Sequence, residues 1–221
     1  MGVYKVMLFK ERKDAGHRLA QALSKHEAKP QTLILALPRG GVVVGFEVAA
    51  ALSLPLDIVC PRKIGAPFNP ELAIGAVTET GENILSDDLI RSLGVSEAYI
   101  QEAIKREKRE ALRRLAYYRQ KRPPRELKGK TVILVDDGLA TGSTMRAAIK
   151  TCRAEKVQHL ILAVPVAPPD TLQHIKQEVD QVICLSAPPS FQAVGQYYSH
   201  FDPTSDEEVI ALLTKQYAVH S

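Results

Sequence analysis

Short apolar runs recur along the chain, and each is followed by a segment with helical periodicity. The runs seldom alternate with polar residues and are rich in β-branched side chains. Such runs are typical of strands that are buried on both faces, as in a parallel sheet. The sequence therefore predicts a doubly wound, mainly parallel α/β sheet with helices on both faces. The predicted strands cover residues 32–37, 56–60, 132–135, 159–166 and 180–185, with a further short edge strand over 3–9.

The predicted helices differ in how their apolar side chains are distributed. Asp14 is expected to cap a first helix, and Ser96 a long amphipathic helix over 96–121. A helix over 42–52 is apolar nearly all round, which favours burial. Further helices are expected to begin near Ser86 and to cover 170–178 and 206–215. The apolar stripe of the long helix consists of Ile100, Ala103, Ile104, Ala111, Leu112, Leu115 and Tyr118.

Two segments lack a regular pattern. Residues 61–70 are rich in Pro and Gly and predict a loop, which precedes a hairpin over 73–78 and 82–85. Residues 186–203 are irregular and contain Phe191, Tyr197, Tyr198 and Phe201. The length suits one well-buried domain over 1–221. We expect a core over about 10–185, a flexible loop over about 61–85, a long basic helix over about 96–122, and a C-terminal hood and helix over about 186–217.

The composition limits the compartments and partners that are expected. No apolar run reaches the length of a membrane span, and the first residues lack the apolar core of a signal peptide. The scattered residues Cys60, Cys152 and Cys184 favour a reducing compartment over a disulfide or metal framework. We therefore expect a cytoplasmic protein that makes no contact with a membrane.

The net charge of +4 is distributed unevenly. Residues 105–130 contain twelve Lys and Arg against three Glu. One interpretation is a solvated helix held by salt bridges, and the other is a face that binds a nucleic acid backbone. Tyr117 and Tyr118 are too few for a platform on which bases stack. Nucleic acid is thus the less favoured partner of this helix, and the alternative stays open.

The most informative stretch is residues 131–148, TVILVDDGLATGSTMRAA. Asp136 and Asp137 follow a buried strand, and a small, hydroxylated turn then leads into a helix. Backbone N–H groups at the start of a helix, together with its dipole, favour a bound anion such as phosphate. Carboxylates instead accept hydrogen bonds from sugar hydroxyls. This order of residues predicts a ligand that has a phosphate at one end and a diol nearby.

These residues resemble the 5-phosphoribosyl-1-pyrophosphate (PRPP) signature of the type I phosphoribosyltransferases, including its predicted bacterial members. The match is ILV-DD-GL-ATGST. It implies that Asp136 and Asp137 hold the ribose 2′- and 3′-hydroxyls. It also implies that the 5′-phosphate lies on Ala140, Thr141, Gly142, Ser143 and Thr144. Gly138 stands where the family usually has an aliphatic residue, and this is expected to loosen the turn without removing a ligand group.

The same resemblance implies roles for residues outside the signature. The family's pyrophosphate loop follows the first core strand, where Arg39, Gly40 and Gly41 stand. A glycine pair allows close backbone approach, and Arg allows bidentate phosphate contact. The family's mobile loop implies that Arg62 and Lys63 approach the pyrophosphate. Its hood, which covers the acceptor, makes Tyr198 a candidate substrate contact.

The resemblance implies an enzyme that displaces pyrophosphate from PRPP with a nitrogen nucleophile, a nucleobase being the favoured acceptor. Asp136, Asp137, Arg39 and Lys63 are its expected catalytic residues, with Asp137 the best-placed general base. Mg²⁺ is the expected cofactor, held through the substrate rather than by protein alone, with Asp136 as a candidate ligand. A homodimer is expected from the family. Two alternatives remain: a regulator with this fold that binds nucleotide and RNA or DNA without catalysis, and a PRPP-dependent enzyme with a non-nucleobase acceptor.

Overall fold

The computed structural model describes residues 8–120, 122–123 and 125–219. The edge strand predicted over 3–9 lies almost wholly outside the described residues. Phe9, its last residue, forms an isolated parallel bridge with Tyr198. Within the described part of the chain, no helix combines the length and the apolar character needed to cross a membrane.

A five-stranded parallel sheet forms the centre of the fold, in the order β2-β1-β6-β7-β8. Ala36 of β1 is in register with Ile58 of β2 and with Val135 of β6. The carboxyl ends of these strands therefore meet at one edge of the sheet. This confirms the predicted parallel sheet. The strands are β1 (Thr32–Ala36), β2 (Leu56–Ile58), β6 (Thr131–Val135), β7 (His159–Val166) and β8 (Gln181–Ser186).

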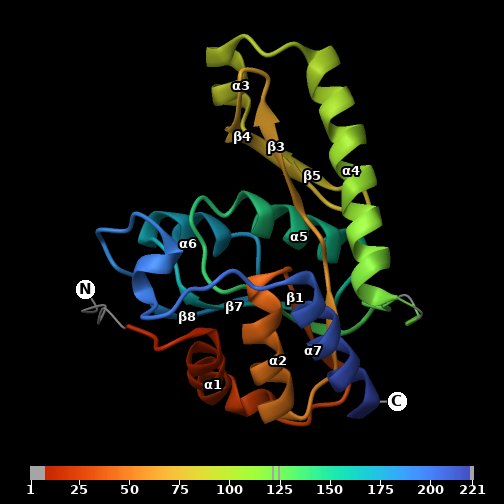
Figure 1. Ribbon diagram of the computed structural model, residues 1–221, viewed down its shortest axis with the longest axis vertical. Helices are drawn as coiled ribbons and strands as arrows, with labels where there is room; N and C mark the ends of the chain where they lie inside the picture. Colours follow the sequence, from red (N-terminus) through yellow and green to blue (C-terminus); the bar gives the residue numbers. More distant parts are fainter. Residues whose placement is uncertain (1–7, 121, 124, 220–221) are drawn as a thin grey trace.

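Helices cover both faces of the sheet, as the apolar pattern predicts (Figure 1). On one face, side chains of α1 and α2 form a core with Ile34, Ile133 and Ile161 of the central strands. On the other, α5 and α6 form a core with the alternate side chains Leu35, Leu134 and Leu162. The helices are α1 (Arg12–Ala22), α2 (Gly40–Leu52), α5 (Ser143–Ala154), α6 (Pro169–Ile175) and α7 (Asp206–Val219), with short 3₁₀ helices η1 (Ser24–His26) and η2 (Val194–Tyr197).

A second unit, which we call the arm, projects from this core (Figure 1). Its antiparallel sheet has the order β3-β4-β5. Ile64, Ala66 and Ile74 of this sheet are buried together with Ala103 of the long helix α4. The arm consists of β3 (Arg62–Ala66), β4 (Asn69–Val77), β5 (Asn83–Leu85), α3 (Asp87–Leu93) and α4 (Glu97–Arg119).

Three local predictions are wrong. Residues 61–70 are not a loop, because Ile64 and Ala66 alternate with more exposed neighbours and pack inward as strand β3. Asp14 is not an N-cap, since α1 begins at Arg12 and Asp14 lies in its first turn. Leu112 is not part of a buried stripe, since its residue surface is 46% exposed.

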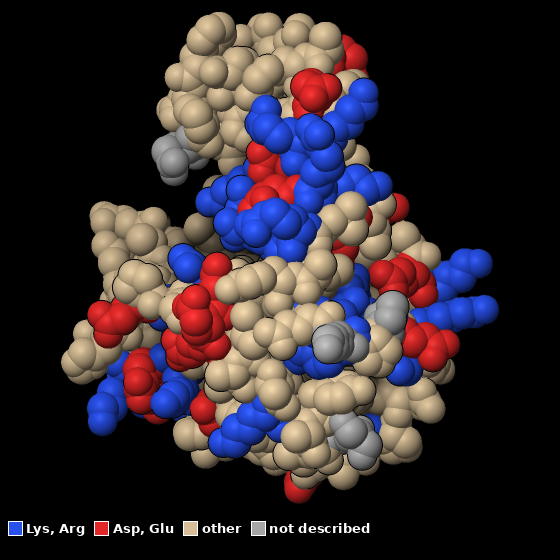
Figure 2. Space-filling model, turned by 45° about the vertical axis from the view of Figure 1, so that its right-hand side comes forward, with Lys and Arg blue, Asp and Glu red and all other residues tan. Residues whose placement is uncertain are grey.

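The cap of α4 is confirmed, and much of this helix's charge is internally paired. The Ser96 side chain accepts the Tyr99 N–H at 3.3 Å. Arg113 and Arg114 both donate to Glu110, which lowers the pKa of that carboxyl to about 2. Figure 2 shows the cations of this helix gathered with acidic side chains among them. This pairing fits the salt-bridged interpretation of the basic stretch, and the nucleic-acid alternative stays a prediction.

A buried ion pair joins the arm to the core. Glu79, in the turn between β4 and β5, accepts from Arg125 at 2.6 Å, and the two side chains are 3% and 6% exposed. The second oxygen of Glu79 accepts the backbone N–H of Cys60 at 3.1 Å. Arg125 also reaches Glu155, at the end of α5, at 3.3 Å. The contact thus connects both ends of the arm to the sheet and its covering helix.

Replacing Glu79 with Gln is expected to lower the free energy of unfolding by roughly 3–5 kcal/mol, because it leaves a buried guanidinium with only the partly exposed carboxylate of Glu155. Urea denaturation followed by circular dichroism measures the change. The control is Asp88→Asn, which removes an exposed pair with Arg91 and should cost under about 1 kcal/mol. Equal losses for the two variants would contradict the assignment.

Candidate active site

Two turns that are far apart in the sequence meet where β1 and β6 end. Leu37 donates its backbone N–H to Val135 O at 3.0 Å, which holds the two strand ends together. A Cβ added to Gly40 would lie 2.0 Å from Asp137 Oδ2. A Cβ added to Gly41 would lie 2.8 Å from Asp136 Oδ1. A Cβ at Gly41 would also meet the backbone of Asp136, whereas a Cβ at Gly40 would displace the side chains of Asp137 and Arg12. The predicted pyrophosphate turn therefore packs directly against the predicted diol site.

Asp136 is the first of the two acids and follows β6 directly. Its Oδ1 accepts the backbone N–H of Asp137 at 2.8 Å. Burial, and then the neighbouring charge of Asp137, raises the pKa of the Asp136 carboxyl well above its usual range. A carboxylate in this position gains from hydrogen-bond donors or a cation, because few solvent molecules can stabilise its charge.

Asp137 is held by a residue that sequence patterns did not identify. Arg12 of α1 donates from Nε to Asp137 Oδ2 at 2.7 Å, and the two side chains are only 12% and 16% exposed. Arg12 also donates to the carbonyl oxygen of Asp202 at 2.7 Å and lies 3.8 Å from the ring centroid of Phe201. Asp137 is thereby connected to both α1 and the C-terminal hood. Its role as a general base stays a prediction.

The turn after the acidic pair has the geometry of an anion site. Gly142 has a φ of +75° and immediately precedes α5, whose first turn contains no acidic residue. Thr171 donates to Ala140 O at 2.8 Å, which fixes the turn, while Ala140 and Thr141 remain exposed. The first N–H groups of α5 lack carbonyl partners within the helix and lie at its positive end. Ser143 and Thr144, at that helix start, add hydroxyl donors.

Gly138 makes room for the hood. A Cβ at this position would lie 2.5 Å from Val194 Cγ1 and 3.1 Å from Val166 Cγ1. The Val194 side chain, from η2, thus takes the space that the family's usual aliphatic residue would fill. The prediction of a loosened turn is wrong, because Gly138 is buried and packed.

Arg39 lies at the start of α2 but turns towards α7. Its Nη1 lies 3.7 Å from Asp206 Oδ1, and the Arg39 side chain is 46% exposed. Asp206 Oδ1 also accepts from the Tyr118 hydroxyl at 2.6 Å. The Pro38–Arg39 peptide bond is cis. The structure brings Gly40 and Gly41 to the acidic pair, whereas the Arg39 guanidinium contacts a different carboxylate.

Arg62 and Lys63 leave the sheet at the same edge as the acidic pair, at the foot of β3. Arg62 pairs with Glu107 of α4 at 3.2 Å, and Lys63 is exposed. No described contact joins either residue to Asp136 or Asp137. Their approach to pyrophosphate stays a prediction.

Tyr198 supports the site from behind. It is 6% exposed and packs between Phe9 and Phe201, with ring centroids 5.4 and 5.0 Å away. Its hydroxyl donates to Asp137 O at 2.5 Å. Burial raises the pKa of this phenol. Tyr198 therefore fixes the backbone of Asp137, and its predicted role as a direct substrate contact stays a prediction.

Comparison with known proteins identifies the family of this chain. The sequence model of the phosphoribosyl transferase domain matches residues 8–202. The chain is 43% identical over 208 residues to the Mycobacterium tuberculosis proteins MT0597 (strain CDC 1551) and Rv0571c (strain H37Rv), whose names assign them provisionally to the phosphoribosyl transferases. These matches cover 94% of this chain and 47% of each relative, so the chain spans about half the length of those relatives.

A solved structure matches as well. TT1426 from Thermus thermophilus is 41% identical, with a TM-score of 0.80 and coverage of 95% of this chain and 99% of that one. The chain belongs to the phosphoribosyl transferase family. The family prediction and the predicted fold class are confirmed.

Gly40→Ala is expected to displace Asp137 and Arg12, because the added methyl group has no space. The free energy of unfolding should fall by about 1–3 kcal/mol, and the affinity for PRPP, the ligand that the family resemblance implies, should fall by at least about tenfold. Calorimetric titration and urea denaturation measure the two effects. Gly129→Ala is the control, since its Cβ meets open space although φ is +72°, so it should cost stability alone. Unchanged PRPP binding by Gly40→Ala would rule out the close approach.

Arg12→Gln should lower the free energy of unfolding by roughly 1–3 kcal/mol, because Asp137 is then left largely buried without its cation. A double-mutant cycle with Asp137→Asn should give a coupling energy above about 1 kcal/mol. Arg18→Gln, which removes a more exposed pair with Asp14, serves as the control and should change stability by under about 1 kcal/mol. A coupling energy indistinguishable from zero would mean that the Arg12–Asp137 contact contributes nothing.

Proposed function

We propose that the protein transfers a 5-phosphoribosyl group from PRPP to a nitrogen nucleophile, a nucleobase in the first instance, and releases pyrophosphate. The observation that carries this proposal is the contact of Gly40 and Gly41 with Asp136 and Asp137, next to the open helix start at Ser143. Two anion-binding turns on either side of a carboxylate pair suit a ligand with phosphate at both ends and a diol between them.

Each end of PRPP has a candidate partner in this arrangement. The 5′-phosphate binds the turn from Ala140 to Thr144 through backbone N–H groups and hydroxyls. The ribose 2′- and 3′-hydroxyls donate to Asp136 and Asp137. The pyrophosphate lies over Gly40 and Gly41 at the start of α2. Arg39, Arg62 and Lys63 are the cations available at this edge of the sheet.

The proposed reaction exchanges one bond at carbon 1 of the ribose. The bond from carbon 1 to the pyrophosphate oxygen breaks, and its electron pair leaves with pyrophosphate. The lone pair of the acceptor nitrogen forms the new bond, and the nitrogen's proton passes to a base, with Asp137 as the candidate. Catalysis then consists mainly of positioning the reactants and neutralising the leaving group.

The residues present fit a role for Mg²⁺ that depends on the substrate. Within the described residues, no group of three or more His, Cys, Asp and Glu converges as a metal site. The carboxylate of Asp136 offers a hard oxygen ligand, and the phosphates of PRPP would supply others. When bound, the ion would neutralise charge on the departing pyrophosphate.

The acceptor, the assembly and the compartment are part of the proposal. The hood aromatics Tyr197, Tyr198 and Phe201 pack against Phe9 and Val166, so they support the site from the protein core behind it. A nucleobase acceptor and a homodimer follow from the family resemblance, and a cytoplasmic location follows from the scattered cysteines. A non-nucleobase acceptor remains the alternative within the same chemistry.

The test is release of pyrophosphate from PRPP and Mg²⁺ in the presence of a panel of nucleobases and other amines. The wild-type chain should release pyrophosphate with at least one acceptor. Asp136→Asn combined with Asp137→Asn should lower kcat/KM by at least about 100-fold, equivalent to about 2.7 kcal/mol. Asp88→Asn is the control, because that carboxylate lies on the exposed surface of the arm.

Two outcomes would decide against the proposal. Unchanged PRPP affinity in the double variant would remove the diol site. PRPP binding without pyrophosphate release, together with salt-dependent binding of an RNA probe, would favour the regulator instead.

A further inference from the structure

The carboxylate of Asp206, the first residue of α7, has two partners on different parts of the molecule. Asp206 Oδ1 lies 3.7 Å from Arg39 Nη1, and the same oxygen accepts from the Tyr118 hydroxyl at 2.6 Å. The two donors therefore share the negative charge of one oxygen atom. Among the described residues, no other carboxylate forms an ion pair with Arg39. Asp206 is thus the charge that orients the Arg39 side chain in this structure.

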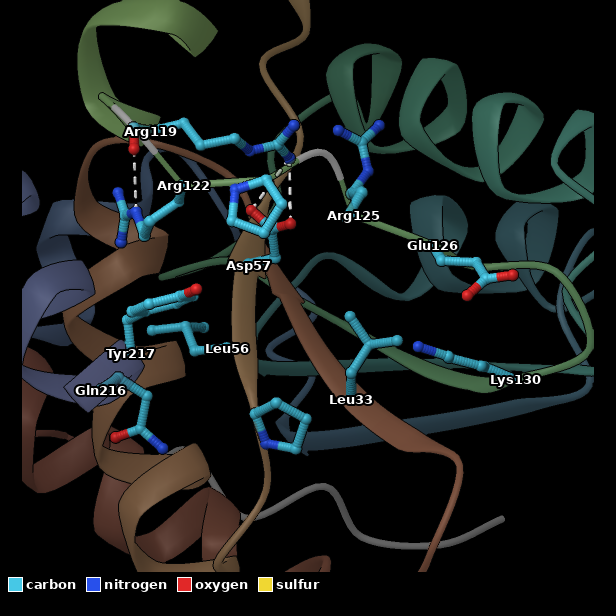
Figure 3. A pocket seen from close by; sticks show the side chains of 12 residues that line it. Leu33, Leu56, Asp57, Arg119, Arg122, Arg125, Glu126, Lys130, Gln216 and Tyr217 are labelled. Atoms are coloured by element: carbon cyan, nitrogen blue, oxygen red, sulfur yellow. Dashed lines mark hydrogen bonds and ion pairs between the residues drawn. The ribbon is translucent and has the colours of Figure 1, made fainter. Parts of the chain in front are cut away.

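The Tyr118 side of this arrangement is fixed by the core. The Tyr118 side chain is 1% exposed and packs with buried side chains of α2 and α7. Burial, and then the hydrogen bond to Asp206, raises the pKa of the phenol, so the hydroxyl remains a donor. The next residue, Arg119, attaches the end of α4 to β2 through two contacts with Asp57 of 2.9 and 3.0 Å, which Figure 3 shows. Tyr118 is therefore a donor in a fixed position.

The Arg39 side chain, by contrast, can change its partner. It is 46% exposed, and its distance from Asp206 exceeds the length of a direct hydrogen bond. Such a pair contributes little free energy, because water screens the two charges. Arg39 directly precedes Gly40, which packs against Asp137 and begins the turn on which the proposed pyrophosphate lies. A guanidinium can contact two phosphate oxygens at once, so pyrophosphate is the stronger competitor for it.

We propose that Asp206 is a positioning residue for Arg39. It holds the guanidinium beside α7 until pyrophosphate replaces it, and the Tyr118 hydroxyl sets how strongly it does so. This inference rests on the pyrophosphate contact in the proposed function. The hydrogen bond from the phenol partly neutralises the carboxylate, so loss of the hydroxyl strengthens the contact with Arg39. Loss of the Asp206 charge releases Arg39, and the two changes therefore alter the affinity for pyrophosphate in opposite directions.

The first test titrates inorganic pyrophosphate into the full chain by calorimetry. Asp206→Asn should tighten binding about two- to fivefold, the range expected when a half-exposed ion pair is removed. Asparagine keeps an oxygen that accepts from the Tyr118 hydroxyl, so the contact between α4 and α7 stays in place. Tyr118→Phe should instead weaken binding by about twofold. Changes in the same direction would overturn the proposal, because a general loosening of the fold would move both variants alike.

Two controls separate the role of Arg39 from a general effect of charge. Glu207→Gln removes the same charge from the neighbouring, exposed position and should leave the affinity unchanged. Asp206→Asn in an Arg39→Gln background should also have no effect, because the guanidinium that Asp206 orients is then absent. A gain in affinity that persists in this background would mean that Asp206 only repels the anion, and this result would contradict the proposal.

A second readout needs no ligand. It follows the Nε–H resonance of Arg39 in the full chain labelled with ¹⁵N-arginine, assigned by its absence from the spectrum of Arg39→Gln. This resonance should move in Asp206→Asn and stay in place in Glu207→Gln. A resonance that stays in place in Asp206→Asn would show that the two side chains do not meet, which would overturn the proposal.

Transfer from PRPP is measured separately, so that this proposal and the proposed function can fail independently. Opposite changes in pyrophosphate affinity without any transfer reaction would support the positioning role of Asp206 and contradict the proposed function. Transfer with unchanged pyrophosphate affinity in both Asp206→Asn and Tyr118→Phe would contradict the positioning role alone.

Discussion

The close contact between two adjacent carboxylates and two adjacent glycines is the constraint on which the candidate site depends. Neither Gly40 nor Gly41 has room for a Cβ, because Asp137 Oδ2 and Asp136 Oδ1 occupy that space. The two neighbouring carboxylates concentrate negative charge, which a protein interior tolerates only when positive charge or hydrogen-bond donors compensate it. Arg12 supplies one positive charge at 2.7 Å, and the start of α2 at Gly40 contributes a helix dipole. The carboxylates are therefore compensated by positive charge and can accept hydrogen bonds from hydroxyl donors, while the helix start beside them favours an anion.

This compensation explains why the two ends of the chain meet at the site. The Arg12 side chain, from the first helix, donates from Nε to Asp137. Its Nη1 donates to the backbone carbonyl oxygen of Asp202 in the C-terminal hood. Tyr198 fixes the carbonyl oxygen of Asp137, and Val194 fills the space that Gly138 leaves. The hood thus has a structural task in addition to any contact with an acceptor. It holds the backbone of the acidic pair where the parallel strands end.

The sequence predicted those parts of the fold that depend on local patterns. Unbroken apolar runs identified the five core strands, because parallel strands buried on both faces need no polar alternation. The acidic pair and the turn at Gly142 were recognised because a short motif carries their chemistry. Arg12 was missed because its partner lies 125 positions away, and a single arginine on an amphipathic helix has no distinguishing pattern. Strand β3 was missed because Pro and Gly at its ends outweighed the inward alternation of Ile64 and Ala66. Burial of Tyr198 depends on Phe9 and Phe201, which only the folded chain brings together.

One carboxylate, that of Asp206, contacts both the arm and the candidate site. Asp206 Oδ1 accepts from Tyr118 near the end of α4 and lies 3.7 Å from Arg39 beside the glycine pair. The contact with Tyr118 is short, and the Tyr118 side chain is buried. The contact with Arg39 is longer, and the Arg39 side chain is half-exposed. The Tyr118 contact is therefore the stronger one, because the water that surrounds Arg39 screens its charge. In the proposed reaction, Arg39 would exchange Asp206 for a phosphate oxygen while the joint between α4 and α7 stays in place. Of the two contacts that Asp206 makes, the one with Arg39 is thus the more easily replaced by an incoming anion.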